Sequence, residues 1–481
     1  MVRTLKAKAY HGVLWSAIDA VVARLIQFVI GVILACLLLP EQFGIIGMLA
    51  VFIGVAQSFM TSGFGSALIQ KKNLDDVDTS SVFYFNIIIG ILLSALLYRM
   101  APWIAAFFDE PILLALTRAM SVVVIIGSFG VVQSALLTRE VGFKTQTKIS
   151  LIALAGSGII GILLAIKGFG VWSLVWQQLS ASTVTVLLLW VFNTWRPKLV
   201  FSLRSLAGMF SFGWRLLASG LATQVFDNIY NLLIGKLFSA ADLGYYTRAS
   251  RLERLPSMTI AQVVSRVTFP VFSSIQDDTR RLREGLRKTL ETVIFVSAPV
   301  MVGLAVVATP LVTILLTDKW LPCVLYLKLL CIGGLLRPFS RLNSNVIMAK
   351  GRTDLYLRLQ VVSKVLTIIN ILLLWRMGIA ALIIGQVGVL LFSQLLTSFF
   401  AGRLVCYTLR EQLWDVCPYL GVSLLMGAVV YASQYLPIAS IALKLGVQIM
   451  VGFLVYTTLC GACRLPAFVE GLGFVRRRIF S

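Results

Sequence analysis

The chain has 481 residues, of which 59% are hydrophobic and only 13% are charged. Soluble globular proteins average about 25% charged residues, so this composition, with a mean hydropathy of +0.92, excludes that class and indicates a polytopic membrane protein. The net charge of +22 does not indicate a nucleic-acid partner, because the basic residues lie mainly in short segments between apolar runs, where they set orientation in the membrane.

Apolar runs follow a short basic N-terminal segment, and each is about 20 residues long, enough to span a bilayer as a helix. They lack the strict alternation of a membrane β-barrel, so we expect an all-α fold. The fourteen predicted spans cover residues 13–38, 44–69, 81–104, 111–137, 149–167, 169–193, 207–238, 242–272, 289–316, 322–348, 355–376, 379–402, 414–434 and 441–463.

Lys and Arg are concentrated in alternate loops between these spans. The richest loop lies between the eighth and ninth spans and carries Arg280, Arg281, Arg283, Arg287 and Lys288. Loops on the opposite side carry little beyond single basic residues such as Lys167 and Lys319. Because basic loops stay in the cytoplasm, and fourteen spans return the chain to its starting side, we expect both termini in the cytoplasm.

The sequence repeats short landmarks at an offset of about 200–210 residues. The pairs are Gln42-Phe43-Gly44 with Asp242-Leu243-Gly244, Asp75-Asp76 with Asp277-Asp278, Asp109 with Asp318, and Gly170 with Gly378. Six spans separate the copies, so both halves have the same orientation, as in a parallel repeat about an axis along the membrane normal. We expect two pseudo-symmetric six-helix lobes, 1–200 and 201–410, around a central cavity, with two further helices in 411–481.

One predicted span, the eighth, is unusually basic. The segment 242–266 reads DLGYYTRASRLERLPSMTIAQVVSR and places Arg248, Arg251 and Arg254 well inside its length. At about 100° per residue, these arginines share a stripe roughly 120° wide, whereas Glu253 points to another side. Each charge at mid-bilayer costs roughly 2.5–3.5 kcal/mol, so the stripe predicts the wall of a wet cavity. The alternative is a shallower helix whose arginines snorkel to lipid headgroups.

Further charges lie inside other spans. They are Asp19 and Arg24 in span one, Arg215 and Asp227 in span seven, and Arg337 and Arg341 in span ten. With the stripe they form the candidate substrate site, in which Asp19, Asp227 and Glu253 are the acidic members. Cations outnumber acids, which favours an anionic cargo, and guanidinium binds phosphate oxygens bidentately. The alternative is that Asp19 pairs with Arg24, and Asp227 with Arg215, as structural ion pairs.

The second predicted span has a polar character of its own. The second span, which corresponds to the basic eighth span, is uncharged but polar along Gln57, Ser58, Thr61 and Ser62.

The sequence contains no P-loop, no G-x-S-x-G and no H-E-x-x-H motif, and no large extramembrane domain that could hold an active site, so we do not expect an enzyme. Cys460 and Cys463 have no neighbouring metal ligands in sequence, and we expect no metal or cofactor.

Several local motifs carry a family resemblance. They are Gln42-Phe43-Gly44, FPVFSSIQDDTRRLR at 269–283, DKWLPCVLYLKLLCIGGLLR at 318–337, and MAKGRTD at 348–354. Together with the fourteen spans and two lobes, they resemble the polysaccharide-transporter branch of the multidrug/oligosaccharidyl-lipid/polysaccharide flippase superfamily, and colanic-acid-exporter-like flippases in particular. The resemblance covers most of the chain and is weakest after about residue 410.

The resemblance implies a function. Members flip an undecaprenyl-pyrophosphate-linked oligosaccharide to the periplasmic leaflet of the bacterial inner membrane, through a cavity walled mainly by spans one, two, seven and eight. The expected partners are this lipid-linked pyrophosphate, membrane lipids and polysaccharide polymerase or export proteins, for a protein that acts as a monomer. Two alternatives stay open: a multidrug extruder, for which buried carboxylates should dominate the cavity, and a peptidoglycan-precursor flippase, which the arginines do not exclude.

Overall fold

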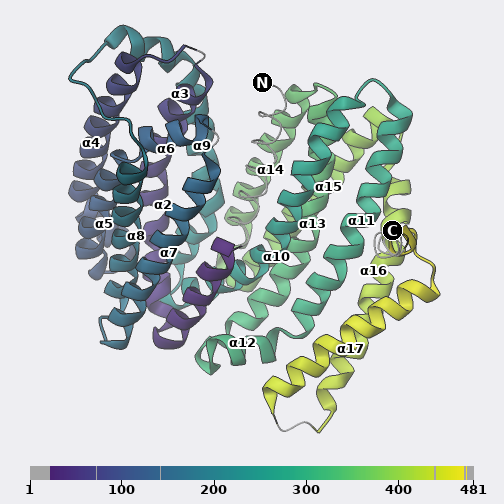
Figure 1. The fold of residues 1–481 in the computed structure, drawn as a ribbon. Helices are drawn as coiled ribbons and strands as arrows, with labels where there is room; N and C mark the ends of the chain where they lie inside the picture. Colours follow the sequence, from purple (N-terminus) through teal and green to yellow (C-terminus); the bar gives the residue numbers. More distant parts are fainter. Residues whose placement is uncertain (1–21, 72, 141, 438–439, 471–472, 474–481) are drawn as a thin grey trace. The chain divides into compact units, whose positions relative to one another are not determined.

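The computed structural model describes residues 22–71, 73–140, 142–437, 440–470 and 473, and within these ranges the chain forms helices without any strand (Figure 1). Ten described helices are long and apolar enough to cross a membrane, and a bent pair makes an eleventh if it counts as one span. The described part of each of the fourteen predicted spans is helical over most of its length. The predicted all-α, multi-span membrane fold is therefore confirmed.

The chain divides into two compact units, Met1–Gly244 and Tyr245–Ser481, each described here by itself. In the first unit, α4 packs against α5, α7 against α8, and α2 against α9. Its elements after the helical segment Val22–Leu37 are α2 (Pro40–Met60), the π-helix η1 (Thr61–Gly65), α3 (Ser66–Gln70), α4 (Asp76–Phe108), α5 (Ile112–Ser128), α6 (Val131–Arg139), α7 (Phe143–Ile166), α8 (Val171–Phe192) and α9 (Leu203–Leu237).

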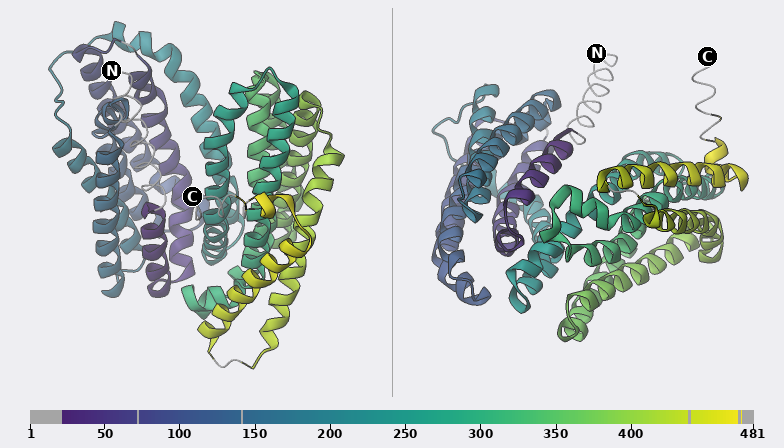
Figure 2. Two further views of the ribbon diagram at one scale, coloured as in Figure 1. Left: turned by 45° about the vertical axis from the view of Figure 1, so that its right-hand side comes forward. Right: turned by 90° about the horizontal axis from the view of Figure 1, so that it is seen from below.

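The second unit begins inside α10 (Ala240–Ser274) and ends with α16 and α17, which pack against each other (Figure 2). Helix α13 packs on both α11 and α15, and a buried core that includes Leu286, Leu342 and Tyr419 holds α11, α13 and α16 together. The elements after α10 are α11 (Thr279–Val306), α12 (Ala308–Leu316), η2 (Asp318–Trp320), α13 (Cys323–Ala349), α14 (Thr353–Leu374), η3 (Trp375–Met377), α15 (Ile379–Val405), α16 (Leu409–Ala432), η4 (Ser433–Tyr435) and α17 (Ile441–Ala462).

Three predicted spans are not single regular helices. The second changes into the π-helix η1, the fourth bends by 42° between α5 and α6, and the ninth breaks into α11 and α12. The α5–α6 break lies at Gly130, just after the Ser128 hydroxyl donates to the Ile125 carbonyl oxygen at 2.7 Å. Such side-chain bonds to the backbone compete with the helical ladder.

Helix α11 begins ten residues before the predicted span. The Asp278 carboxylate caps it by accepting a hydrogen bond from the Arg281 backbone N–H at 3.0 Å, a favourable arrangement at a helix N-terminus. The basic cluster from Arg280 to Lys288 therefore occupies the first turns of a helix and not a loop. Helices α9 and α10, with 35 residues each, are long enough to span but more polar than the other spans.

The paired landmarks have matching local structures. Gly170 and Gly378 both adopt positive φ, 55° and 92°, directly before α8 and α15. Asp75 precedes α4 as Asp278 precedes α11. The two predicted lobes and their symmetry axis stay a prediction, and α9, which the sequence assigned to the second lobe, packs on α2, α4 and η1 in the first compact unit.

The N-terminal turns of α2 and α10 meet at their matching glycines. A Cβ atom on Gly44 would lie 1.7 Å from the Ala240 carbonyl oxygen, and one on Gly244 would lie 2.0 Å from the Pro40 carbonyl oxygen. Only glycine allows two backbones to approach this closely. Both turns are also capped alike, since the Gln42 side chain accepts from the Leu39 N–H at 3.1 Å and the Asp242 carboxylate from the Ser239 hydroxyl at 2.7 Å.

Candidate functional site

The three arginines of the predicted stripe have different surroundings on α10. Arg248 is buried, with 6% of its surface exposed, and its guanidinium lies 5.6 Å from the centre of the Trp320 ring. Arg251 is exposed and Arg254 is half-buried. The Nε atom of Arg254 is buried and forms no hydrogen bond within the described part of the chain. A buried donor left in this state has lost its water without replacement, which is unfavourable.

Glu253 is fully buried and has its partners on two helices. Its Oε1 accepts a hydrogen bond from the Ser257 hydroxyl at 2.7 Å, one turn along α10, and lies 3.3 Å from the Nε of Arg337 on α13. Glu253 therefore neutralises Arg337 and not its neighbours on α10. Breaking a buried pair from one side leaves an uncompensated charge, which is strongly destabilising, so this pair fixes α13 against α10.

The remaining predicted site residues are less closely associated in the structure. Arg341 is exposed on α13, one helical turn after Arg337. In the first unit, Arg24 is half-buried in the segment Val22–Leu37 and Asp227 is exposed on α9. Asp19 and the side chain of Arg215 lie outside the described residues, and with them the two ion pairs that the sequence left open. The use of all these residues by a substrate stays a prediction.

The first unit contains a polar pocket of about 290 Å³. Its polar wall comes from α2, η1, α8 and α9, and consists of Gln57, Ser58, Thr61, Ser182 and Gln224. The sequence had marked Gln57, Ser58 and Thr61 as a polar face, but it gave no sign that Ser182 and Gln224 would join them. Thr61 begins the π-helix η1, a distortion that occurs frequently at functional sites.

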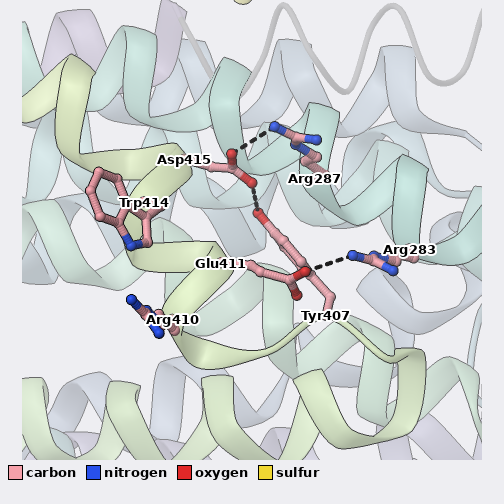
Figure 3. Close-up of a pocket in the computed structure, with 7 residues that line it drawn as sticks. All are labelled: Arg283, Arg287, Tyr407, Arg410, Glu411, Trp414 and Asp415. Atoms are coloured by element: carbon pink, nitrogen blue, oxygen red, sulfur yellow. Dashed lines mark hydrogen bonds and ion pairs between the residues drawn. The ribbon is translucent and has the colours of Figure 1, made fainter.

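A second pocket, of about 340 Å³, lies between α11 and the start of α16 (Figure 3). Arg283 binds Glu411 at 2.8 Å, Arg287 binds Asp415 at 2.7 Å, and the Tyr407 hydroxyl donates to Asp415 at 2.5 Å. Burial raises the pKa of Tyr407, and its hydrogen bond to Asp415 acts in the same direction. Since these charges neutralise one another, we interpret this pocket as a contact that holds α16 on α11.

Comparison with known proteins identifies the family. The profile of the family described as "Polysaccharide biosynthesis protein" matches residues 33–325. The teichuronic acid biosynthesis protein TuaB of Bacillus subtilis (strain 168) is 30% identical over 72% of this chain and 72% of its own length. The lipopolysaccharide biosynthesis protein WzxC of Escherichia coli (strain K12) is 28% identical over 81% of this chain and 78% of its own.

Solved structures share the fold. The lipid II flippase MurJ, in an inward closed conformation, matches with a TM-score of 0.78 over 94% of this chain and 98% of its own, at 18% identity. At this identity the likeness extends to the fold alone. The motifs at Gln42-Phe43-Gly44 and 269–283 lie within the residues that the profile matches. The chain therefore belongs to the family described as "Polysaccharide biosynthesis protein".

Proposed function

We propose that this protein moves a lipid-linked oligosaccharide, carried on undecaprenyl pyrophosphate, across the bacterial cytoplasmic membrane for polysaccharide export. The observation that carries the proposal is the set of arginines on α10, within a bundle that is otherwise strongly apolar. A pyrophosphate crossing hydrocarbon needs cations to replace its hydration, and the planar guanidinium fork suits its oxygens. The names of TuaB and WzxC, which refer to the biosynthesis of teichuronic acid and of lipopolysaccharide, support this cargo class.

Arg248, Arg251 and Arg254 are the proposed pyrophosphate contacts. Arg254 has a buried Nε in need of an acceptor, and Arg251 is exposed and able to reach a ligand. Arg337 has the weakest claim because Glu253 already neutralises it. Arg24, Arg215 and Arg341 are further proposed contacts, and we propose that the protein works as a monomeric transporter and not as an enzyme.

Two other functions use the same fold. A multidrug extruder handles organic cations and needs available buried carboxylates, but Glu253, which is fully buried, is paired with Arg337. A flippase for a peptidoglycan precursor would carry the same pyrophosphate, and MurJ is named for lipid II. The names of the relatives with the higher sequence identity favour a polysaccharide repeat unit.

Orientation follows from the basic segments and is testable directly. We propose that both termini are cytoplasmic. A reporter inserted at Asp277, immediately before the basic first turns of α11, and one fused to the C-terminus should both report cytoplasm, whereas one at Asp318, between α12 and α13, should report periplasm. A periplasmic C-terminus would overturn the proposed orientation.

The cargo is identified by a deletion strain. Loss of this protein should abolish one surface polymer and cause a single undecaprenyl-pyrophosphate-linked oligosaccharide to accumulate, which mass spectrometry of extracted lipids would identify. Re-expression of the wild-type chain should restore export, and a variant with Arg248, Arg251 and Arg254 all changed to Ala should not, at equal protein level in the membrane. Normal export by that triple variant would exclude the arginines of α10 as the phosphate site.

A further inference from the structure

The polar pocket of the first unit contains side chains whose hydrogen-bonding capacity is unused. Of the five polar residues that the structure describes in its wall, only Thr61 has a side-chain hydrogen bond to another described residue, which its hydroxyl donates to the Gln57 carbonyl oxygen at 3.0 Å. Gln57, Ser58, Ser182 and Gln224 make no side-chain hydrogen bond within the described part of the chain. Gln57 is exposed, and Ser58, Ser182 and Gln224 are half-buried, so their unused donors and acceptors are open to a ligand with many polar groups.

The described lining of this pocket is neutral. Among the residues that the structure describes in this wall there is no Lys, Arg, Asp or Glu, so these residues offer neither an ion pair to a phosphate nor a carboxylate to a cation. A glutamine amide both donates and accepts, and so does a serine hydroxyl. Sugar hydroxyls also donate and accept, so a sugar is the neutral group that such a wall fits best. A volume of about 290 Å³ lies at the lower end of small-molecule sites, which suits one ring and not a whole oligosaccharide.

A glycine fixes the position of one amide. A Cβ atom added to Gly54 would lie 1.8 Å from the Nε2 of Gln224, so this amide occupies the space left by the missing side chain. The obstructed atom is the far end of a flexible side chain. An alanine at Gly54 should therefore turn the amide away while leaving the helices in place, which separates the pocket from the fold.

The pocket lies well inside the helices that build it. Within the continuous helical stretch Pro40–Gln70, Gln57 lies seventeen residues after the start, or about 25 Å at 1.5 Å per residue, and thirteen residues before the end. Ser182 is halfway along α8. A group bound here is therefore carried at the depth of the apolar core and not at a membrane surface.

We propose that this pocket binds one sugar ring of the lipid-linked cargo and so contributes to the choice of oligosaccharide, an inference that rests on the proposed transport function. The neutral wall in the first unit would select the sugar, and the arginines of α10 would hold the pyrophosphate. Recognition of the sugar and recognition of the phosphate would then be separable by mutation.

The test uses the purified full-length protein in nanodiscs and two probes. One is bare undecaprenyl pyrophosphate, and the other is the sugar-bearing lipid extracted from the deletion strain. Two or more hydrogen bonds to the sugar should give the wild type at least about tenfold tighter binding of the sugar-bearing lipid. The variants Gly54→Ala and Gln57→Leu with Ser182→Ala should lose most of this preference and bind the bare lipid as the wild type does.

The matched control is Ser180→Ala, two residues before Ser182 on α8. The Ser180 hydroxyl donates to the Trp176 carbonyl oxygen of its own helix at 2.7 Å and does not line the pocket, so this variant should keep the full preference. The proposal of a sugar site would be wrong if the pocket variants kept the preference for the sugar-bearing lipid, or if their binding of both lipids weakened equally. Either result would leave the proposed transport function intact. A wild type that binds neither lipid would instead overturn the transport function, and the sugar site with it.

Discussion

Helices α2 and α10 occupy corresponding places in the predicted repeat but differ in chemistry. Both begin with a capped turn and a glycine, at Gln42-Phe43-Gly44 and Asp242-Leu243-Gly244. The helical stretch Pro40–Gln70, which comprises α2, η1 and α3, carries neutral polar side chains that line a pocket. Helix α10 instead carries arginines and one fully buried glutamate. The two helices thus share the backbone geometry of their first turns and differ in the polar side chains of their interior positions.

The largest effect is expected at Glu253, the buried acid of α10. Glu253→Ala leaves Arg337 without its partner, and breaking a buried ion pair from one side typically costs about 3–5 kcal/mol. We expect a large drop in the thermal unfolding midpoint and in the protein level in the membrane. Glu284→Ala is the control, because its pair with Arg280 is exposed and such pairs contribute less than about 1 kcal/mol.

A double variant at Glu253 and Arg337 tests whether the unpaired charge causes the loss of stability. Replacing both Glu253 and Arg337 by Leu removes both charges, and well-packed apolar residues often replace a buried pair at no net cost. We therefore expect the double variant to be more stable than Glu253→Ala alone. Equal stability of Glu253→Ala and the wild type would show that the pair does not hold α10 and α13 together.

The next effect concerns export and separates two arginines of α10. Losing a charge-assisted contact of about 1.5–3 kcal/mol should slow export roughly ten- to hundredfold in Arg248→Ala and in Arg251→Ala. Arg248→Ala should also lower the unfolding midpoint, because its guanidinium packs on Trp320 and such contacts are stabilising, whereas exposed Arg251 should not affect it. Lysine keeps the charge but not the fork, so Arg251→Lys should be intermediate.

Arg266→Ala is the control for these export measurements, since Arg266 is exposed on the same helix but nearer its C-terminal end. It should transport close to the wild-type rate, with export normalised to protein level in the membrane. If Arg266→Ala slowed export as much as Arg251→Ala does, the total positive charge of α10, and not a local contact with phosphate, would account for both effects.

A smaller loss of stability is expected at the close backbone crossing of α2 and α10, which Gly44 and Gly244 allow. Gly44→Ala and Gly244→Ala each place a methyl group against a backbone carbonyl, and overpacking of this kind costs about 1–3 kcal/mol. Gly156→Ala on α7 is the matched control, because nothing lies within 4 Å of its added Cβ, and alanine there should be neutral or stabilising by up to about 1 kcal/mol. Unfolding midpoints that fall equally in all three variants would contradict a close crossing.

The smallest effect is expected in the pocket of the first unit. Ser182→Ala and Gln57→Leu remove side chains that hold no hydrogen bond to the described residues, so the free energy of unfolding should change by no more than about 0.5 kcal/mol. Thermal unfolding of the purified variants checks this. A marked loss of stability would assign these side chains to the fold and not to a ligand.

Much of the fold could be predicted because membrane spans are encoded locally. An apolar run of about 20 residues identifies a span without knowledge of its neighbours, and landmarks such as Gly170 and Gly378 revealed matching turns with positive φ. Breaks inside spans were missed, because the π-helix η1 and the bend between α5 and α6 scarcely alter hydropathy. The early start of α11 was missed because its charged turns resemble a loop, although Asp278 as a possible cap was a usable signal.

The site was less predictable because its contacts join distant parts of the chain. The stripe on α10 followed from helical periodicity alone. That Glu253 would meet Arg337, 84 residues later, depends on how α10 and α13 pack, and no local pattern encodes it. The pocket is a similar case, because Gln57 and Ser58 are adjacent in sequence, whereas Ser182 and Gln224 reach them only through the fold of the first unit.

The crossing at Gly44 and Gly244 has the reciprocity of an isologous dimer contact. Residue 44 meets residue 240, and residue 244 meets residue 40, so a shift of 200 positions exchanges the two halves of the contact. Self-complementary contacts of this kind are what identical subunits form about a twofold axis. A chain of half this length, paired with a second copy of itself, could make the same contact with one glycine. If two such copies were fused, the rest of each half could change in sequence, but both glycines would have to remain, because a Cβ atom at either position would clash with the facing carbonyl oxygen.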